Sequence, residues 1–417
     1  MGKKDTGCNR SLWILNHHAT GPGRHEGFAR ELAARGWRVK IFAASFMHNL
    51  FRELKIYPPG VNCLLEENGI ERVWIKAPPY FSNGVRRLFN QLVFARRSWL
   101  AGRGMDRPGI ILGSSVHLFA GLAGLFLARR HKVPFVFEVR DFWPQVLVDM
   151  GVLRRGGSAE RLMGWLESFL YSKAGRIIYV PPGGADYLAG RGVEREKTVY
   201  IPNGVDLAWF DRCLADDCLD PELARFFGEC QDKMLFVYTG AHGRANGLDV
   251  LVKAAAVVQQ AGEQRIHFLL VGEGPEKPAL EKLAGEYGLC NLTFRPGVPK
   301  DMVPLIIKRA AGCILSLEAG GAFRYGISFN KLFDYLAGSR PVVAAAPAGL
   351  ALLEQAGSVI RVAPGDPPAL AGAVVELART APGERLGIGL AGRRYVERHH
   401  SMPVLAGKLE KVLEELL

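Results

Sequence analysis

The sequence predicts two doubly wound α/β domains, each built on a parallel β-sheet with helices on both faces. The chain has 417 residues, more than twice the roughly 150 residues of a typical domain. Short apolar runs alternate with segments of 3.6-residue apolar spacing along nearly its whole length, which is the order of βαβ units. The runs are continuous rather than alternating, as in strands that are covered on both faces.

Each apolar run marks an expected strand. These strands are residues 11–16, 37–43, 72–76, 109–114, 134–139, 176–180 and 198–201 in the first half, and 234–238, 266–271, 292–295, 313–317, 341–345 and 358–362 in the second. Apolar or amphipathic segments between and after them predict helices at residues 28–35, 118–128, 248–258, 278–287 and 403–417.

The break between the two series falls at Pro202-Asn203-Gly204, a turn triplet that is followed by a polar stretch at residues 211–233. That stretch shows little periodicity, which is typical of a hinge region. We therefore expect an N-terminal domain at residues 1–205, a C-terminal domain at residues 206–400 and a C-terminal helix at residues 401–417.

Charge is distributed unevenly along the chain. The net charge is +12, but the first 200 residues hold 30 Lys and Arg against 16 Asp and Glu, whereas the remaining 217 hold 23 against 25. The first part, at +14, is expected to face a polyanion or an anionic surface, while the second, at −2, is nearly neutral.

Several classes of protein are excluded by composition. Hydrophobic residues make up 48% of the chain and charged residues 23%, which argues against disorder. The longest apolar run, residues 118–128, is far shorter than the roughly 20 residues that span a bilayer, and the charged N-terminus lacks a secretory signal. The seven cysteines contain no CxxC pair, which favours reduced thiols and gives no zinc signature. A cytoplasmic protein without a metal is predicted.

Two loops of the first half are candidates for chemistry, because ligands of open parallel sheets bind beyond the carboxyl ends of the strands. After the first strand, two histidines precede a loop with Gly21 and Gly23 that opens a helix, where free N–H groups attract anions. The strand at residues 134–139 is followed by the charged pair Arg140 and Asp141, which is costly to bury unless it is paired or solvated. A plain connecting turn and a structural ion pair are the alternatives.

The second half contains two glycine-rich loops, each between a strand and a helix. Their candidate ligand-binding residues are Gly240, His242 and Arg244 in the first loop and Gly272, Glu273 and Gly274 in the second. Either loop alone is weak evidence, but two in one βαβ series favour a phosphate-bearing ligand.

Residues 324–343 carry the most specific signal of the chain. Ser328 or Asn330 is suited to cap a helix whose first turn carries Lys331, with Arg324 before it and Asp334 one turn on. A lysine and a helix N-terminus that converge on one point would bind a diphosphate, and the carboxylate would accept hydrogen bonds from ribose hydroxyls. An amphipathic helix with a solvated lysine is the structural alternative.

Residues 85–99 carry an apolar stripe flanked by arginines. The stripe consists of Val85, Leu88, Phe89, Leu92, Ala95 and Trp99, and the flanking residues are Arg86, Arg87 and Arg97. A basic helix with aromatic residues predicts contact with an anionic membrane surface. A helix that packs on the core has the same spacing, and Arg96 interrupts the stripe, so both interpretations stay open.

Taken in order, these segments resemble a known family. They read NHHATGPGRHEGFARELAARGW, APPYFSNG, VRDFWP, IPNGVD, YTGAHGRANGLDVL, VGEGPEKP and YGISFNKLFDYLAGSRPVV. The set resembles the retaining nucleotide-sugar glycosyltransferases of family 4, which have the GT-B fold of two facing Rossmann-like domains. It is most similar to the bacterial O-antigen and capsule branch, including N-acetylfucosamine-type transferases.

The resemblance implies a nucleoside diphosphate sugar as donor, such as a UDP-sugar, retention at the anomeric carbon, and no obligatory metal or other cofactor. A hexosyl or N-acetylhexosaminyl group would be transferred. The family's E-x7-E signature falls on Gly326 and Asp334, so its first glutamate is absent. Its usual basic pair reads Ala241 and Asn246, and Arg140 stands where many relatives have histidine. Neutralisation of the phosphates is therefore expected from Lys331.

With the basic first half, this resemblance predicts an acceptor glycan on a polyprenyl diphosphate at the inner face of the cell membrane, in lipopolysaccharide or capsule biosynthesis. Asp141 is expected to contact the donor sugar or the acceptor hydroxyl, with Arg140 and Lys331 as the other catalytic residues. Two alternatives are a nucleotide-sugar 2-epimerase of similar fold and a non-catalytic polyanion-binding protein. No recognition-helix or zinc signature indicates nucleic acid as a partner.

Overall fold

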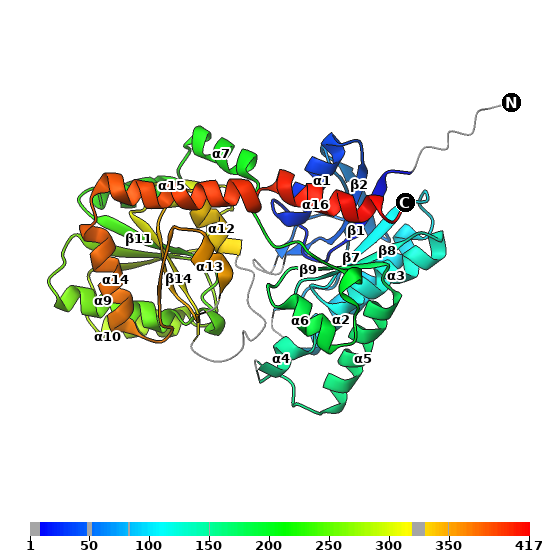
Figure 1. Ribbon diagram of the computed structural model, residues 1–417, viewed down its shortest axis with the longest axis horizontal. Helices are drawn as coiled ribbons and strands as arrows, with labels where there is room; N and C mark the ends of the chain where they lie inside the picture. The colour runs from blue at the N-terminus through cyan, green and yellow to red at the C-terminus, as the bar shows by residue number, and fades with distance from the viewer. Residues whose placement is uncertain (1–8, 48–51, 82–83, 150, 319–329, 349) are drawn as a thin grey trace. The chain divides into compact units, whose positions relative to one another are not determined.

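The computed structural model describes residues 9–47, 52–81, 84–149, 151–318, 330–348 and 350–417. It confirms the α/β class, with parallel sheets in two compact units (Figure 1). Unit 1 contains the described residues of 9–203 and 402–417, and unit 2 contains those of 204–318 and 330–401. No helix within the described ranges is long and apolar enough to cross a membrane.

Unit 1 is built on a sheet whose described strands follow the order β10-β9-β8-β7-β1-β2-β6-β5. All neighbours are parallel except β5 and β6, which are antiparallel. The strands are β1 (Ser11–Leu15), β2 (Arg38–Ala44), β5 (Cys63–Glu67), β6 (Glu71–Ile75), β7 (Ile110–Ser114), β8 (Phe135–Val139), β9 (Arg176–Tyr179) and β10 (Thr198–Tyr200), with a short separate pair, β3 (Phe46–Met47) and β4 (Arg52–Glu53).

Helices cover both faces of this sheet, over two buried apolar clusters. They are α1 (Arg24–Ala34), α2 (Val85–Gly102), α3 (Leu118–His131), α4 (Gln145–Asp149), α5 (Ser158–Lys173), α6 (Gly184–Gly190), the 3₁₀ turn η1 (Arg195–Lys197) and the C-terminal α16 (Met402–Glu414). The apolar run at 118–128 is the buried helix α3. Helix α1 begins four residues earlier than predicted, because its first turn carries the buried polar residues Arg24 and His25 rather than apolar ones.

The C-terminal helix α16 returns the chain to unit 1. It lies beside α1 (Figure 1), and Met402, Leu405 and Leu409 join the apolar cluster beneath that helix. Each such buried side chain stabilises the fold by roughly 1.5–3 kcal/mol. The amphipathic tail therefore completes the first unit.

Unit 2 contains a parallel sheet whose described strands follow the order β13-β12-β11-β14-β15-β16. The strands are β11 (Met234–Thr239), β12 (Ile266–Val271), β13 (Leu292–Arg295), β14 (Gly312–Ser316), β15 (Val342–Ala345) and β16 (Val359–Val362). The helices are α7 (Leu207–Asp216), α8 (Pro221–Glu229), η2 (Arg244–Asn246), α9 (Leu248–Gln260), α10 (Lys277–Glu286), α11 (Met302–Lys308), α12 (Asn330–Ala337), α13 (Ala351–Gln355), α14 (Pro367–Arg379) and α15 (Pro382–His399).

The polar stretch at residues 211–233 corrects the prediction of an irregular hinge segment. Most of it belongs to α7 and α8, which are part of unit 2. Asp206 caps α7 by accepting a hydrogen bond from the backbone N–H of Trp209, and Asp220 caps α8 before a proline in its first turn. Aspartate caps and an N-terminal proline are helix-start signals. Each helix also buries one apolar side, with Phe210 and Cys213 in α7 and Leu223 and Phe226 in α8.

Candidate functional site

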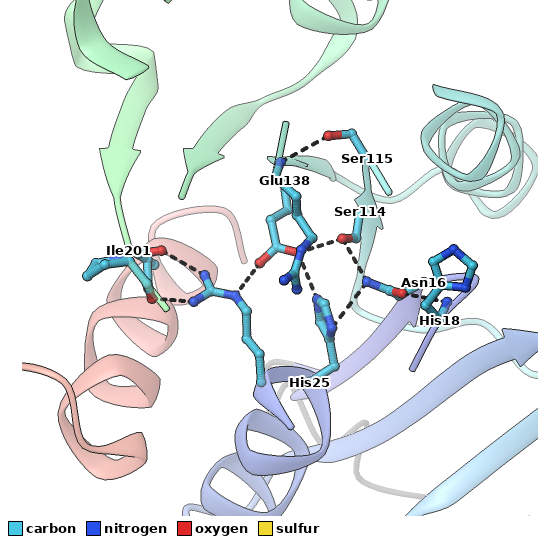
Figure 2. A network of polar contacts seen from close by, with 10 residues as sticks. Asn16, His18, His25, Ser114, Ser115, Glu138 and Ile201 are labelled. Atoms are coloured by element: carbon cyan, nitrogen blue, oxygen red, sulfur yellow. Dashed lines mark hydrogen bonds and ion pairs between the residues drawn. The ribbon is translucent and has the colours of Figure 1, made fainter. Parts of the chain in front are cut away.

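A buried polar cluster lies at the carboxyl ends of three neighbouring strands of unit 1 (Figure 2). Asn16 follows β1, Ser114 ends β7 and Glu138 lies near the end of β8, while His25 reaches them from the first turn of α1. All four residues are buried, and Glu138 is inaccessible to solvent. We call these four residues and Arg24 the Glu138 cluster.

The hydrogen bonds of the Glu138 cluster form one consistent set. The side-chain amide of Asn16 donates to the Ser114 Oγ at 2.9 Å and to the His25 Nδ1 at 3.2 Å. The Ser114 hydroxyl then donates to the Glu138 Oε2 at 2.6 Å, and the His25 Nε2 donates to the same oxygen at 2.7 Å. Neutral His25 with its proton on Nε2 therefore satisfies every contact, provided that Glu138 is ionised.

Arg24 supplies the compensating charge. Its Nε lies 2.7 Å from the Glu138 Oε1, and its two terminal nitrogens donate to the backbone carbonyls of Ile201 and Pro202. Burial opposes the charge on Glu138, but His25 and Arg24 outweigh it and hold the pKa of this carboxyl well below its usual range. Burial lowers the pKa of His25 in turn. The cluster thus fixes the chain at the end of unit 1.

The sequence-predicted residues of unit 1 surround this cluster without belonging to it. Gly21 lies in the loop before α1, and Gly23 directly precedes the helix. Arg140 follows β8, where its backbone N–H donates to the Ser115 hydroxyl at 3.0 Å, and the next residue, Asp141, is exposed. Asp141 is therefore available to a ligand at the carboxyl edge of the sheet.

In unit 2, Lys331 reaches the carboxyl end of β11 from the first turn of α12. Its Nζ donates to the Tyr238 hydroxyl at 2.6 Å and to the Asn246 Oδ1 at 2.8 Å, and it lies 4.2 Å from the centre of the Tyr238 ring. Within the described part of the chain, neither of these partners carries charge. Burial lowers the pKa of Lys331 to about 7, because charge is costly to bury without a counterion.

The two glycine-rich loops of unit 2 pack backbone against backbone. A Cβ on Gly272, whose φ is 157°, would lie 1.8 Å from the carbonyl oxygen of Gly240. A Cβ on Gly274 would lie 2.3 Å from the backbone oxygen of His242. At Gly240, whose φ is 145°, a Cβ would come within 3.2 Å of the Lys331 Nζ. These glycines therefore allow the two loops and the lysine to converge.

Three of the predicted ligand-binding side chains of unit 2 differ in their surroundings. The His242 ring is completely buried, and burial with the nearby Lys277 lowers its pKa to about 4, so the neutral ring has no surface to offer a ligand. Arg244, whose side chain is 82% exposed, pairs with Glu318 at 3.1 Å. Glu273 pairs with Lys277 at 2.9 Å. Arg244 and Glu273 are therefore ion-paired within the protein, whereas neither ring nitrogen of His242 has a hydrogen-bond partner among the described residues.

The carboxylate predicted to bind ribose also has a partner. Asp334 is buried on α12 and forms an ion pair with Lys300, which comes from the loop after β13. Asn330 is the exposed first residue of the same helix. Arg324, Gly326 and Ser328 lie outside the described residues.

The predicted apolar stripe lies on α2, and most of it faces solvent. Val85 and Phe89 are 82% and 56% exposed, and Leu88 and Leu92 are also exposed, whereas the opposite side with Phe94 is buried. The core-packing alternative is therefore wrong for these four residues. It is correct for the other end of the stripe, where Ala95 and Trp99 pack partly on the core.

The arginines beside the stripe are placed differently. Arg86 is exposed, Arg87 is half-buried, and Arg97 is half-buried and donates to the backbone carbonyl of Lys76. The ring of Trp99 is covered by the Arg103 guanidinium at 5.0 Å. The exposed apolar surface is thus confined to the first half of α2.

Sequence reasoning missed the Glu138 cluster and the partners of Lys331 and Asp334 in unit 2. A charged residue inside the apolar run at 134–139 was a usable signal for Glu138, since such a charge needs a buried partner. No local pattern indicated that Tyr238 and Asn246 would hold Lys331, or that Lys300 would pair with Asp334. Among the described residues, no three His, Cys, Asp or Glu side chains gather to hold a metal ion.

Two family models match most of the chain. Residues 20–204 match the glycosyl transferase 4-like domain, and residues 233–380 match glycosyl transferases group 1. WcaI of Escherichia coli K12, described as a colanic acid biosynthesis glycosyl transferase, is 25% identical over 311 residues, which cover 73% of this chain and 74% of that protein.

Solved structures share the fold over nearly the full length. Sucrose-phosphate synthase from Thermosynechococcus elongatus superposes with a TM-score of 0.73 at 20% identity, covering 97% of this chain and 98% of that one. Anabaena HepE, solved in complex with UDP and glucose, gives a TM-score of 0.69 at 15% identity, covering 97% of this chain and all of that one.

Proposed function

Because this chain belongs to the GT-B glycosyltransferases, we propose that it transfers a sugar from a UDP-sugar to a lipid-linked saccharide, with retention at the anomeric carbon. The observation that supports the donor assignment is Lys331, a half-buried amine at the carboxyl end of β11 whose described partners are both neutral. Such a group gains a counterion when a diphosphate arrives. The complex of the structural neighbour HepE with UDP supports the same donor class.

In the proposed mechanism, unit 2 stabilises the leaving group. The bond between the anomeric carbon and the β-phosphate oxygen breaks, and negative charge grows on that phosphate. The Lys331 ammonium, held by the Tyr238 hydroxyl and the Asn246 carbonyl oxygen, donates a charge-assisted hydrogen bond to it. The lysine packs against the backbone of Gly240, where a Cβ would come within 3.2 Å of its Nζ.

Unit 1 would bind the acceptor and the sugar. Exposed Asp141 stands at the end of β8, where we propose that it orients the acceptor hydroxyl or a hydroxyl of the donor sugar. Attack from the face that the diphosphate leaves gives retention, and the hydroxyl proton passes to the departing phosphate oxygen. The Glu138 cluster holds the strand ends that carry Arg140 and Asp141 in place.

No metal is required in this proposal, because Lys331 supplies the positive charge that a bound cation would otherwise provide. The nucleotide-sugar 2-epimerase considered from the sequence is not favoured, since both matching family models are transferase models.

A donor panel with the Lys331→Ala variant tests the function. UDP-sugars are incubated with a lipid-linked saccharide fraction, and UDP release and glycosylated lipid are measured together. Lys331→Ala should lower turnover by roughly 10²–10³-fold, as for loss of one donor to a developing anion, whereas the matched control Lys253→Ala on α9 should not. Equal turnover in the two variants would remove Lys331 from the mechanism, and an epimer formed without acceptor would identify an epimerase.

We also propose that α2 places unit 1 on an anionic membrane. Its exposed residues Val85, Leu88, Phe89 and Leu92 lie on one side of the helix, with Arg86 and Arg96 exposed beside them. Amphipathic helices with basic flanks bind in the headgroup region through apolar burial and charge attraction together. An acceptor with a polyprenyl diphosphate anchor would be met at this surface.

Flotation with phosphatidylglycerol vesicles tests the membrane contact. The wild-type chain should float with them at low salt and less with phosphatidylcholine vesicles, and Leu88→Ser with Phe89→Ser should abolish flotation. The matched control is Leu162→Ser with Trp165→Ser, a second exposed apolar pair of unit 1 on α5. If the α2 variant floats like wild type, α2 is not the membrane element.

A further inference from the structure

Unit 2 contains a basic hollow at the amino ends of its central strands. It has a volume of about 410 Å³, and it lies where β11, β14 and β15 begin, within the 300–1,000 Å³ range of ligand pockets. Five cationic side chains line it: Lys233, Lys308, Arg309, Arg340 and Arg385. None of the described residues that line it is acidic. We call this feature the basic hollow.

Most of the charge in the basic hollow is not neutralised. Asp217 pairs with Arg309 at 3.0 Å and lies 3.9 Å from Lys308. Lys233 donates instead to the backbone carbonyl of Gln264 at 2.9 Å. One carboxylate therefore faces two cations, and a third is held by a neutral group.

The two remaining arginines are held by backbone oxygens. Arg385 donates to the carbonyls at the end of α14, the nearest being that of Thr380 at 2.8 Å. Arg340 donates to the carbonyl of Lys308, while its Nε is buried without a hydrogen-bond partner among the described residues. These carbonyl oxygens are neutral, so the charges of Arg340 and Arg385 have no carboxylate partner among the described residues.

We propose that the basic hollow binds a soluble molecule that carries two or more phosphate groups, at a site separate from the sugar-donor site. Guanidinium groups bind phosphate through paired hydrogen bonds, and lysines add charge. The hollow and Lys331 lie at opposite ends of β11, a strand of six residues that spans about 20 Å. One diphosphate cannot reach both.

The experiment uses inorganic pyrophosphate as the probe and the full-length Lys331→Ala chain as the parent, so that binding at the donor site is weakened from the start. Pyrophosphate is titrated calorimetrically into this parent at constant ionic strength, with chloride as the balancing anion. Lys233→Gln and Lys308→Gln are then added singly and together. Both lysines are exposed, so their replacement leaves the core intact, and a melting curve for each variant checks this.

The parent should bind one pyrophosphate per chain, and the double replacement should weaken binding by about tenfold or more, with each single replacement intermediate. The matched control, Lys253→Gln with Lys282→Gln, removes two exposed positive charges elsewhere in unit 2 and should leave binding unchanged. The inference is overturned if the parent binds no pyrophosphate, if the double replacement has no effect, or if the control weakens binding equally. Because none of these readouts is catalytic, failure here is distinct from failure of the proposed transferase function.

Discussion

Binding of UDP should be accompanied by uptake of a proton by Lys331. In the free protein, burial lowers the pKa of this lysine to about 7, so that roughly nine chains in ten carry it as a neutral amine at pH 8. A diphosphate beside the amine favours the charged form, and a rise of about 2.5 units, within the roughly 1–3 units that a neighbouring opposite charge produces, brings its pKa to about 9.5. The lysine is then almost fully protonated in the complex, and each UDP bound at pH 8 should bring about 0.9 proton with it.

The sign of this effect sets the pH dependence of affinity. Because the complex holds more protons than the free protein, affinity falls as pH rises above 7. With a bound-state pKa near 9.5, the Kd should increase by about 40-fold between pH 7 and pH 9. Neighbouring groups do not titrate in this window: the pKa of His242 is lowered to about 4, and that of Tyr238 is raised above its ordinary value by burial.

Calorimetry in two buffers of different ionisation enthalpy measures the proton directly. At pH 8 the terminal phosphate of UDP, with a pKa near 6, is already ionised and contributes little. Lys331→Met should abolish the uptake, whereas Lys253→Met, which removes an exposed lysine of the same unit, should preserve it. The reasoning is refuted if the wild-type chain takes up less than about 0.2 proton per UDP bound. It is also refuted if Lys331→Met takes up as many protons as the wild-type chain.

Two further predictions concern the stability contribution of the Glu138 cluster and the independence of sugar transfer from divalent cations. Glu138→Gln should lower the free energy of unfolding by about 3–5 kcal/mol at neutral pH, because it leaves Arg24 buried without its counterion. The folded pKa of Glu138 lies well below its usual value, so this difference in unfolding free energy should be present above pH 5 and shrink as the pH falls through the folded pKa. Urea denaturation of both proteins at several pH values measures it. An equal difference at pH 3 would contradict the prediction. Transfer of sugar should persist in excess EDTA, and a loss that Mg²⁺ restores would show that Lys331 does not replace a cation.

The strands were predictable because each one is a continuous apolar run. All runs that the sequence marks, from residues 11–16 to 358–362, form strands in the structure within two residues of the expected bounds. The described strands that escaped prediction are β5 and the two-residue strands β3 and β4. β5 reads CLLEE and has no buried face to produce a pattern. The other strands were predictable because they are buried on both faces of the sheet, which requires a continuous apolar run.

The position of Lys331 was predictable for a different reason. A Gly-bearing loop after β11 and a lysine at the start of α12 both belong at the carboxyl edge of one parallel sheet, and the structure brings them together. The pairing of Asp334 with Lys300 was not predictable, because the two residues are 34 positions apart and an ion pair of this kind depends on loop geometry. Side chains turned inwards, such as His242, could not be distinguished from ligand-facing ones by spacing.

The Glu138 carboxylate of unit 1 has a charged partner whereas the Lys331 amine of unit 2 has neutral ones, and this difference favours the assignment of the donor phosphates to unit 2. In unit 1, the Glu138 carboxylate accepts hydrogen bonds from Arg24, His25 and Ser114. An anion would have to compete with Glu138 for these three donors. In unit 2, half-buried Lys331 has two neutral partners among the described residues, so its charged form is favoured when a negative charge binds. The Glu138 cluster therefore has a structural role in unit 1, whereas the amine of Lys331 in unit 2 is suited to bind a diphosphate.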